Sequence, residues 1–323
     1  MKKLLGKIIL FLLVIAVLCV CVVGVSVVVP PLEQVIGTLT CSNDYDASEE
    51  LGKIEEIDKV KYSTGYKKLI VDDSVCATMF KRLQDKNDVY LFAGTNRAFS
   101  FPGFYIQIKE FLDNNPDAEE VYVFVGKDTW ETTLDAQYGY HCLILPLVYT
   151  DTYKYLDENT KEYCDKAYPG LLLNKTFVDA YMKSSLIRKL TLNLLLEYHS
   201  KILGEDVSVP FVKTDNEVSP LAYQYFNDIL KLCNERGVAV HFIHDPSEYN
   251  SERIEAYNRE CEMLREVEDD SNRDIIELYL NSILYYPAED FIDDVHFKGD
   301  KDLNDSVIRD MQRVTGLLQD INL

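Results

Sequence analysis

Short apolar runs alternate with amphipathic stretches from about residue 66 onward, and this alternation predicts strands and helices in turn. Five runs have the length and the β-branched or aromatic content of strands: 68–72, 89–93, 120–125, 238–243 and 274–278. The runs are continuous, which is typical of strands buried on both faces of a parallel sheet. Helices are predicted at 75–84, 103–114, 219–236, 251–266 and 303–319. This order predicts an α/β fold with a three-layer, doubly wound parallel sheet.

The N-terminal end of the chain differs from the rest in being almost entirely apolar. Residues 8–29 are 22 consecutive positions without a charge, and a helix that spans a bilayer needs about 20. Lys2, Lys3 and Lys7 flank this run, and the positive-inside rule keeps them in the cytoplasm. We therefore expect residues 1–32 to be a single-pass transmembrane anchor, with the remainder extracytoplasmic. A cleaved secretory signal and a buried helix are the alternatives.

Beyond the anchor, the composition divides the chain into a lead-in and one large domain. Residues 33–65 are polar and weakly periodic, so we expect them to form a stalk before an α/β domain at 66–323. A tyrosine-rich insertion at 130–218, with an apolar helical stretch at 175–203, separates the third and fourth predicted strands. The insertion is expected to cover one end of the sheet, as a cap over a site or as a packing layer.

Charge and cysteine usage exclude some classes of function. The 323 residues carry a formal net charge of −21, which argues against a nucleic-acid partner. The cysteines beyond the anchor fit no zinc spacing, and both disulfides and buried thiols remain open for them. His241 and His244 lie three apart on a predicted strand and face opposite sides, so they cannot chelate one metal. No metal or other cofactor is expected.

Polar side chains follow the predicted strands where those strands end. After the first three strands come, in order, Asp72-Asp73-Ser74, Gly94-Thr95-Asn96 and Gly126-Lys127-Asp128. An Asp-x-x-His sequence, from Asp293 to His296, precedes the last helix. Ligands of open α/β sheets bind outside the carboxyl ends of the strands, so these side chains are expected to converge there. A serine at the start of a helix, an asparagine and an Asp-x-x-His are the parts of an acyl-transfer site.

Each candidate has a separate chemical task. Ser74 is the candidate nucleophile, and its own backbone N–H at the start of a helix is directed at a developing oxyanion. His296 is the candidate general base, and Asp293 is expected to hold its tautomer. The Gly94 backbone and the Asn96 amide are further candidate oxyanion donors.

Two further residues are candidates for binding substrate, and several candidates have structural alternatives. Asp128 is placed to bind substrate hydroxyls, and Trp130, the only tryptophan, is placed to stack on a sugar ring. A solvated turn is the alternative for Asp128, and plain packing is the alternative for Trp130. Ser74 is also suited to be an ordinary helix N-cap, and Asn96 to be a turn residue.

The layout resembles the SGNH (GDSL-type) hydrolase superfamily. Asp72-Asp73-Ser74 and Asp293-Asp294-Val295-His296 carry the resemblance, and residues 95–125 are similar to membrane-anchored members. The resemblance implies a flavodoxin-like fold and a serine esterase or O-acyltransferase with an acyl-serine intermediate. It also implies a cell-surface polysaccharide or other acylated glycopolymer as substrate, and a membrane-bound O-acyltransferase as a partner to consider.

The chain departs from this family at two positions. The family's Gly-Asp-Ser reads Asp72-Asp73-Ser74, and its asparagine after the third strand is replaced by Gly126-Lys127-Asp128. These departures favour an alternative from another class, a non-catalytic anchored carbohydrate-binding or scaffold protein. A metal-dependent phosphoesterase is disfavoured, since no carboxylate–histidine cluster has ligand spacing. Hydrolase and transferase remain equally open.

Overall fold

A computed structural model describes most of the chain, in two compact units. The described residues are 48–72, 79–94, 100–126, 129–132, 144–168, 170–183, 216–293 and 296–323, together with Phe11, Val14 and Ile187. One unit comprises Met1–Ala47 and Asp165–Ser208, and the other comprises Ser48–Cys164 and Val209–Leu323. The second unit contains the sheet, on which the candidate site depends.

Within the described residues, the main sheet has four parallel strands. They are β1 (Lys68–Asp72), β2 (Tyr90–Gly94), β3 (Glu120–Val125) and β4 (Ala239–His244), in the order β2-β1-β3-β4. Four of the five predicted strands are thus confirmed to within one residue. The fold is α/β with a parallel sheet, as the alternation of apolar runs predicts.

The fifth predicted strand, 274–278, is wrong, because these residues lie in helix α13 (Arg273–Asn281). Its buried residues are Ile276, Tyr279 and Leu280. Their i, i+3, i+4 spacing places them on one helical face, which packs inward. The predicted strand 274–278 ends before Tyr279 and Leu280, and without these two residues its apolar positions show no helical period.

The long helices follow the sequence closely. They are α5 (Phe101–Asn114), α11 (Pro220–Arg236), α12 (Ser251–Glu266) and α14 (Lys301–Thr315). Helix α11 begins where Ser219 Oγ accepts a hydrogen bond from the backbone N–H of Ala222 at 3.0 Å. It ends at Gly237, whose φ of 68° lies in the left-handed region. The insertion contributes shorter helices: α7 (Leu145–Tyr149), η3 (Tyr153–Tyr155), α8 (Glu158–Ala167) and α9 (Lys175–Lys183).

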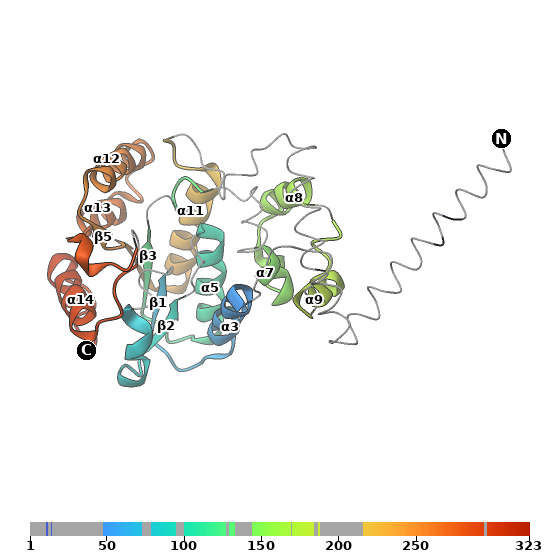
Figure 1. The fold of residues 1–323 in the computed structure, drawn as a ribbon, viewed down its shortest axis with the longest axis horizontal. Coiled ribbons are helices and arrows are strands. Elements are labelled where there is room, and N and C mark those ends of the chain that lie inside the picture. The colour runs from blue at the N-terminus through green and yellow to red at the C-terminus, as the bar shows by residue number, and fades with distance from the viewer. Residues whose placement is uncertain are drawn as a thin grey trace. The chain divides into compact units, whose positions relative to one another are not determined.

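Helices lie on both faces of the sheet, as Figure 1 shows. On one face of the sheet, helix α5 packs against β1 and helix α11 packs against β4. Phe226 of α11 contacts Phe242 of β4, with ring centroids 5.0 Å apart. The other face is covered by α14 and by η1 (Lys81–Lys86), the helical turn that follows β1. There one buried cluster contains residues of the sheet, of η1 and of α14, including Ile70, Leu83 and Ile308.

Part of the predicted stalk belongs to the folded domain. Residues Ser48–Tyr62 form helix α3, which contacts α5 and β2. Ile54, Ile57 and Val60 are buried at a spacing of three residues, which is one helical face. The described part of the lead-in is therefore a packed helix at the edge of the sheet.

The outer edge of β2 is covered by side chains in place of a further strand. The Gln84 amide donates to the Tyr90 carbonyl at 2.7 Å and accepts from the Phe92 N–H at 3.1 Å. Lys59 Nζ of α3 donates to the Phe92 carbonyl. Gln84 thus satisfies this edge as the peptide group of a neighbouring strand would, which protects it from pairing with other chains.

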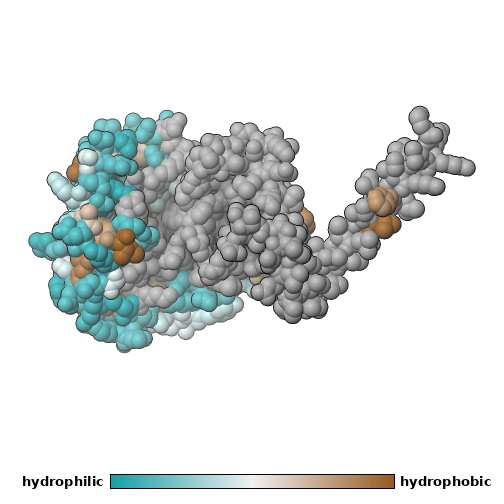
Figure 2. Space-filling model, viewed as in Figure 1, coloured by the Kyte–Doolittle hydropathy of each residue, from teal (hydrophilic) through white to brown (hydrophobic). Residues whose placement is uncertain are grey.

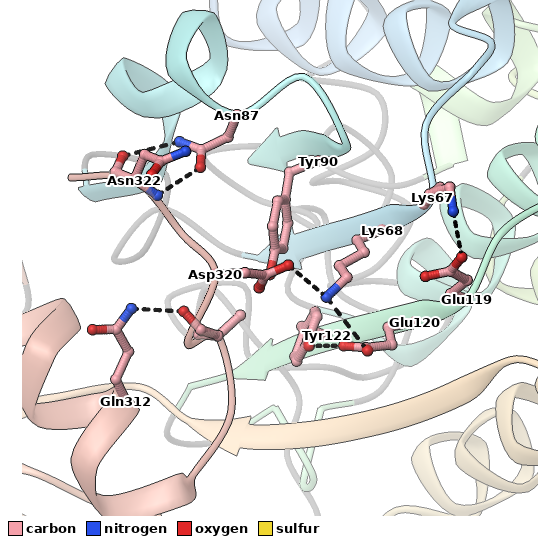
Figure 3. A network of polar contacts seen from close by, with 11 residues as sticks. Lys67, Lys68, Asn87, Tyr90, Glu119, Glu120, Tyr122, Gln312, Asp320 and Asn322 are labelled. Atoms are coloured by element: carbon pink, nitrogen blue, oxygen red, sulfur yellow. Dashed lines mark hydrogen bonds and ion pairs between the residues drawn. The ribbon is translucent and has the colours of Figure 1, made fainter.

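A polar network fixes the C-terminal segment to the amino end of the sheet (Figure 3). Asp320 lies 2.9 Å from Lys68 Nζ and accepts a hydrogen bond from the Tyr90 hydroxyl at 2.5 Å. Partial burial raises the pKa of Asp320, but the hydrogen bonds from Lys68 and Tyr90 outweigh it, and that pKa lies below its usual range. Asn322 donates its N–H to Asn87 Oδ1 at 2.7 Å. This network lies at the edge opposite to the carboxyl ends of the strands.

None of the helices in the described ranges is long and apolar enough to cross a membrane. The predicted anchor at 1–32 lies outside the described residues, except for Phe11 and Val14.

Three of the cysteines are described, and each carries a thiol that forms no disulfide bond. Cys164 and Cys233 are buried, while Cys261 is partly exposed. Burial raises the pKa of Cys233 to about 12 and also raises that of Cys261, which makes both poor nucleophiles at neutral pH. For these three positions the thiol alternative holds. The remaining cysteines lie outside the described residues.

Candidate active site

The strand order creates a topological switch between β1 and β3, because β2 lies on one side of β1 and β3 on the other. Ligand crevices of open α/β sheets form outside the carboxyl ends of the strands at such a point. Ser74 comes two residues after β1 and Asp128 three residues after β3, although both, like Asn96, lie outside the described residues. Gly94 ends β2 and is aligned with Asp72, the last residue of β1. The candidates therefore follow three adjacent strand ends.

His296 and Asp293, predicted to act together, are hydrogen-bonded to each other. His296 Nδ1 lies 2.8 Å from Asp293 Oδ2, and the His296 backbone N–H donates to Asp293 Oδ1 at 2.6 Å. A carboxylate only accepts hydrogen bonds, so Nδ1 carries the proton and Nε2 is the nitrogen suited to accept one. The side chains of His296 and Asp293 are 35% and 48% exposed, so a substrate can reach the pair from solvent.

A small hairpin presents this pair. Phe291 and Phe297 form an antiparallel bridge, and their buried rings stack with centroids 4.4 Å apart. The Ile292 N–H donates to the His296 carbonyl at 2.8 Å. The two phenylalanines anchor both ends of the loop in the cluster that also contains Phe124 of β3. The positions before Asp293 and after His296 are thus held by buried packing.

The hairpin is connected to the carboxyl side of the sheet. Ser247, three residues after β4, begins β5 (Ser247–Glu248), which pairs in parallel with β6 (Tyr285–Tyr286). Tyr286 packs against Phe297 of the hairpin with ring centroids 5.4 Å apart. The His296–Asp293 pair therefore lies on the side of the sheet where β4 ends. The parallel strands β1, β2 and β3 end on this same side, and the strand-end candidates follow them in the sequence.

Trp130 has the environment of a core residue. It is 1% exposed, and its ring lies 4.4 Å from that of Phe101, 5.3 Å from Phe226 and 5.7 Å from Tyr279, between centroids. A ring covered in this way has almost no face on which a sugar could stack. The position of Trp130 fits the packing alternative, and we leave it out of the proposed site.

The two histidines of β4 have different environments. His241 stacks on Tyr122 with ring centroids 5.1 Å apart, and burial lowers its pKa. His244 is buried, with Nε2 3.5 Å from Glu260 Oε2 and Nδ1 2.6 Å from the Asp245 carbonyl. Among the described residues, no group of three or more histidines, cysteines and carboxylates could hold a metal ion. The contacts described for His241 and His244 are thus ring packing and hydrogen bonds.

Sequence reasoning missed the contacts that support the site. Phe291 and Phe297 flank the Asp-x-x-His, and one aromatic residue on each side of a short polar loop is a signal for a hairpin. The pairing of His244 with Glu260 joins β4 to α12, and no spacing rule indicates it. Such contacts depend on how elements pack, which a single sequence does not state.

The hairpin-borne His296–Asp293 pair and the adjacent strand ends are the features from which a function can be inferred. No family model, no curated protein and no solved structure matches this chain.

Proposed function

We propose that this protein is a serine-dependent acyl-transfer enzyme, an esterase or an O-acyltransferase, that acts through an acyl-Ser74 intermediate. The observation that carries the proposal is the Asp293–His296 pair, with 2.8 Å between Oδ2 and Nδ1. This pair supplies the base of a triad and the group that orients it. Ser74, which follows β1 at the topological switch, is the nucleophile that would complete the triad.

In the first step, Ser74 Oγ attacks the carbonyl carbon of an ester, and Nε2 of His296 takes the hydroxyl proton. The Asp293 carboxylate stabilises the imidazolium that forms and itself stays ionised. The electron pair of the C=O π bond moves to the carbonyl oxygen, which becomes an oxyanion; the N–H groups of Ser74 and Gly94 and the Asn96 amide are its proposed donors. Removing one such donor typically costs about 10²–10³-fold in kcat.

In the second step, the tetrahedral intermediate collapses and the C–O bond to the leaving alcohol breaks. The alcohol takes the proton from His296, and the acyl group remains on Ser74. Attack by water, with His296 again as base, releases a carboxylic acid, whereas attack by a sugar hydroxyl makes a new ester. Asp128 is the proposed contact for the substrate's hydroxyl groups.

The finer fold, the location and the substrate class belong to the same proposal. The order β2-β1-β3-β4 supports a flavodoxin-like, three-layer, doubly wound domain of SGNH type. The apolar run at 8–29 supports a membrane anchor with an extracytoplasmic domain. On the face in Figure 2, the described surface is mainly hydrophilic with isolated hydrophobic residues, which suits a domain that meets a hydrated glycopolymer.

The proposal is tested by ester hydrolysis with the purified full-length protein and an activated acetyl ester. Ser74→Ala and His296→Ala are expected to abolish turnover while circular dichroism stays that of the wild type. The exposed residues Ser306 and Asp302, both on α14, provide matched controls, since Ser306→Ala and Asp302→Asn leave the proposed machinery intact. A folded wild type without turnover, or a Ser74→Ala variant with full turnover, would contradict the proposal.

One observation favours a second candidate function, a non-catalytic carbohydrate-binding protein of the same fold. Asp72 is 1% exposed at the end of β1, where the resemblance calls for glycine, so this strand end differs from that of the family. A binding protein would retain a glycopolymer equally well in the wild type and in Ser74→Ala, without turnover in either. Turnover that disappears in Ser74→Ala excludes this candidate.

A further inference from the structure

The proposed nucleophile and base lie on two segments that are far apart in the chain. Ser74 precedes the helical segment that includes Met79 and ends with η1, whereas His296 precedes α14. Proton transfer requires the hydroxyl and the imidazole to meet within hydrogen-bond reach, and a displacement of about 1 Å can cost about 10²-fold in rate. Contacts between these two segments therefore bear on the rate.

Arg82 of η1 and Asp305 of α14 form an ion pair between these segments, through Nη2 and Oδ1. Arg82 comes eight residues after Ser74, and Asp305 comes nine residues after His296. The side chains are 25% and 8% exposed, so the pair is largely withdrawn from water. A charge pair with this little exposure is screened less than a surface pair, and removing one partner leaves the other charge uncompensated.

Apolar packing also joins the two segments, next to the ion pair in both of them. Phe80 and Leu83 of the first segment share the buried cluster with Val307 and Ile308 of α14. Apolar contacts of this kind allow sliding, because they are not directional. The Arg82 guanidinium is a planar donor with fixed geometry, so it adds the register that the apolar contacts lack.

We propose that Arg82 and Asp305 are a positioning pair that fixes the segment of Ser74 relative to the hairpin of His296. This inference rests on the proposed function. Both residues are assigned a positioning role, because they act through the placement of the two segments and take no part in the chemical steps. The pair is thus expected to affect kcat, with little effect on KM.

The test compares kcat and KM for ester hydrolysis by the full-length wild type and by Arg82→Met, Arg82→Lys and Asp305→Asn. The assay temperature is well below the unfolding midpoint of each protein. Arg82→Met and Asp305→Asn are expected to lower kcat about 10–100-fold, with KM within about twofold of the wild type. Arg82→Lys keeps the charge but not the planar guanidinium, so its kcat is expected to lie between that of the wild type and that of Arg82→Met.

Helix α14 offers a matched control. Arg313 pairs with Asp310 of the same helix at 2.6 Å and is 74% exposed, so this pair does not join the two segments. Arg313→Met is therefore expected to keep the wild-type kcat. Folded Arg82 and Asp305 variants with wild-type kcat would overturn the inference, as would an equal loss in Arg313→Met.

The double variant Arg82→Met/Asp305→Leu separates positioning from stability. Each single variant leaves one charge uncompensated, which is expected to lower the unfolding midpoint. Replacing both charges by apolar side chains is expected to return the midpoint to that of the wild type, while kcat stays low. Recovery of kcat together with the midpoint would mean that the pair serves stability only, which overturns the inference. Failure of the proposed function is distinguishable, because it is seen in the wild type as absent turnover.

Discussion

The carboxylate of Asp293 holds His296 by hydrogen bonds to both its ring and its backbone. Oδ2 lies 2.8 Å from Nδ1, and Oδ1 accepts the His296 N–H at 2.6 Å. The ring orientation and the loop conformation are thus set by the same group. In the proposed reaction, a histidine fixed in this way has the required tautomer before substrate binds.

Asp293→Asn is expected to lower kcat/KM for ester hydrolysis by about 10²–10⁴-fold, because an amide facing Nδ1 favours the wrong tautomer. The unfolding midpoint is expected to change little, since the Asp293 side chain is half-exposed. Steady-state kinetics with thermal unfolding measures both quantities, and Asp302→Asn serves as the control. A rate within twofold of the wild type would show that Asp293 does not orient the base.

Stability is expected to fall at mildly acidic pH because of His241. Burial lowers the pKa of His241 below the ordinary value of 6.5. The negative charge of Glu120 opposes this shift, and the positive charge of Lys68 adds to it. Between the folded and unfolded pKa values the unfolded chain binds more protons, so the free energy of unfolding falls as pH drops below about 6.5. His241→Phe, which keeps the stacking on Tyr122, is expected to weaken this loss.

Urea unfolding at about pH 7.5 and about pH 5.5 measures the effect, as the difference in the free energy of unfolding between the two conditions. The wild type is expected to lose more stability than His241→Phe. An equal loss in both proteins would show that His241 is not the group responsible.

Gln84→Ala is expected to destabilise the domain by about 1–2 kcal/mol and to increase aggregation. The variant leaves the Tyr90 carbonyl and the Phe92 N–H at the sheet edge without their side-chain partner. Gln319→Ala is the matched control, since the Gln319 amide donates to the carbonyls of Gln312 in α14 and of Leu317, away from the sheet edge. Chemical denaturation and light scattering measure the two effects, and equal behaviour of the variants would contradict the assignment.

Gly237→Ala is expected to destabilise the domain by about 1 kcal/mol, because φ at this position is 68°. An added Cβ would meet no atom within 4 Å at Gly237 or at Gly299, so steric clash does not distinguish the two. Gly299 lacks a positive φ, and Gly299→Ala is expected to stay within about 0.5 kcal/mol of the wild type. Similar unfolding free energies for the two variants would rule out the strain at Gly237.

The sequence predicts the sheet well because the strands carry their own signal. The runs at 68–72 and 120–125 are continuous, apolar and β-branched or aromatic, and they match β1 and β3 in full. The run at 274–278 is also short and contains two β-branched isoleucines, yet Tyr279 and Leu280 extend it into a helix. A short apolar run fits both periods, and only its neighbours decide between them.

The site is predictable where its residues are local in sequence. Asp293 and His296 are three residues apart, and a three-residue spacing within one loop is sufficient for their hydrogen bond. The ion pair of Arg82 and Asp305 joins positions 223 residues apart, and no local pattern encodes it. The burial of Trp130 likewise depends on α5, α11 and α13, which meet only in the folded domain.

In the proposed reaction Ser74 is activated by His296 and becomes acylated. The most direct measurement is labelling of the folded full-length protein by a serine-directed fluorophosphonate, with the modified residue identified by peptide mass spectrometry. One adduct is expected, on Ser74, which is lost in Ser74→Ala and strongly slowed in His296→Ala. An adduct on another residue, or a folded wild type that is not labelled, would show that Ser74 is not the nucleophile.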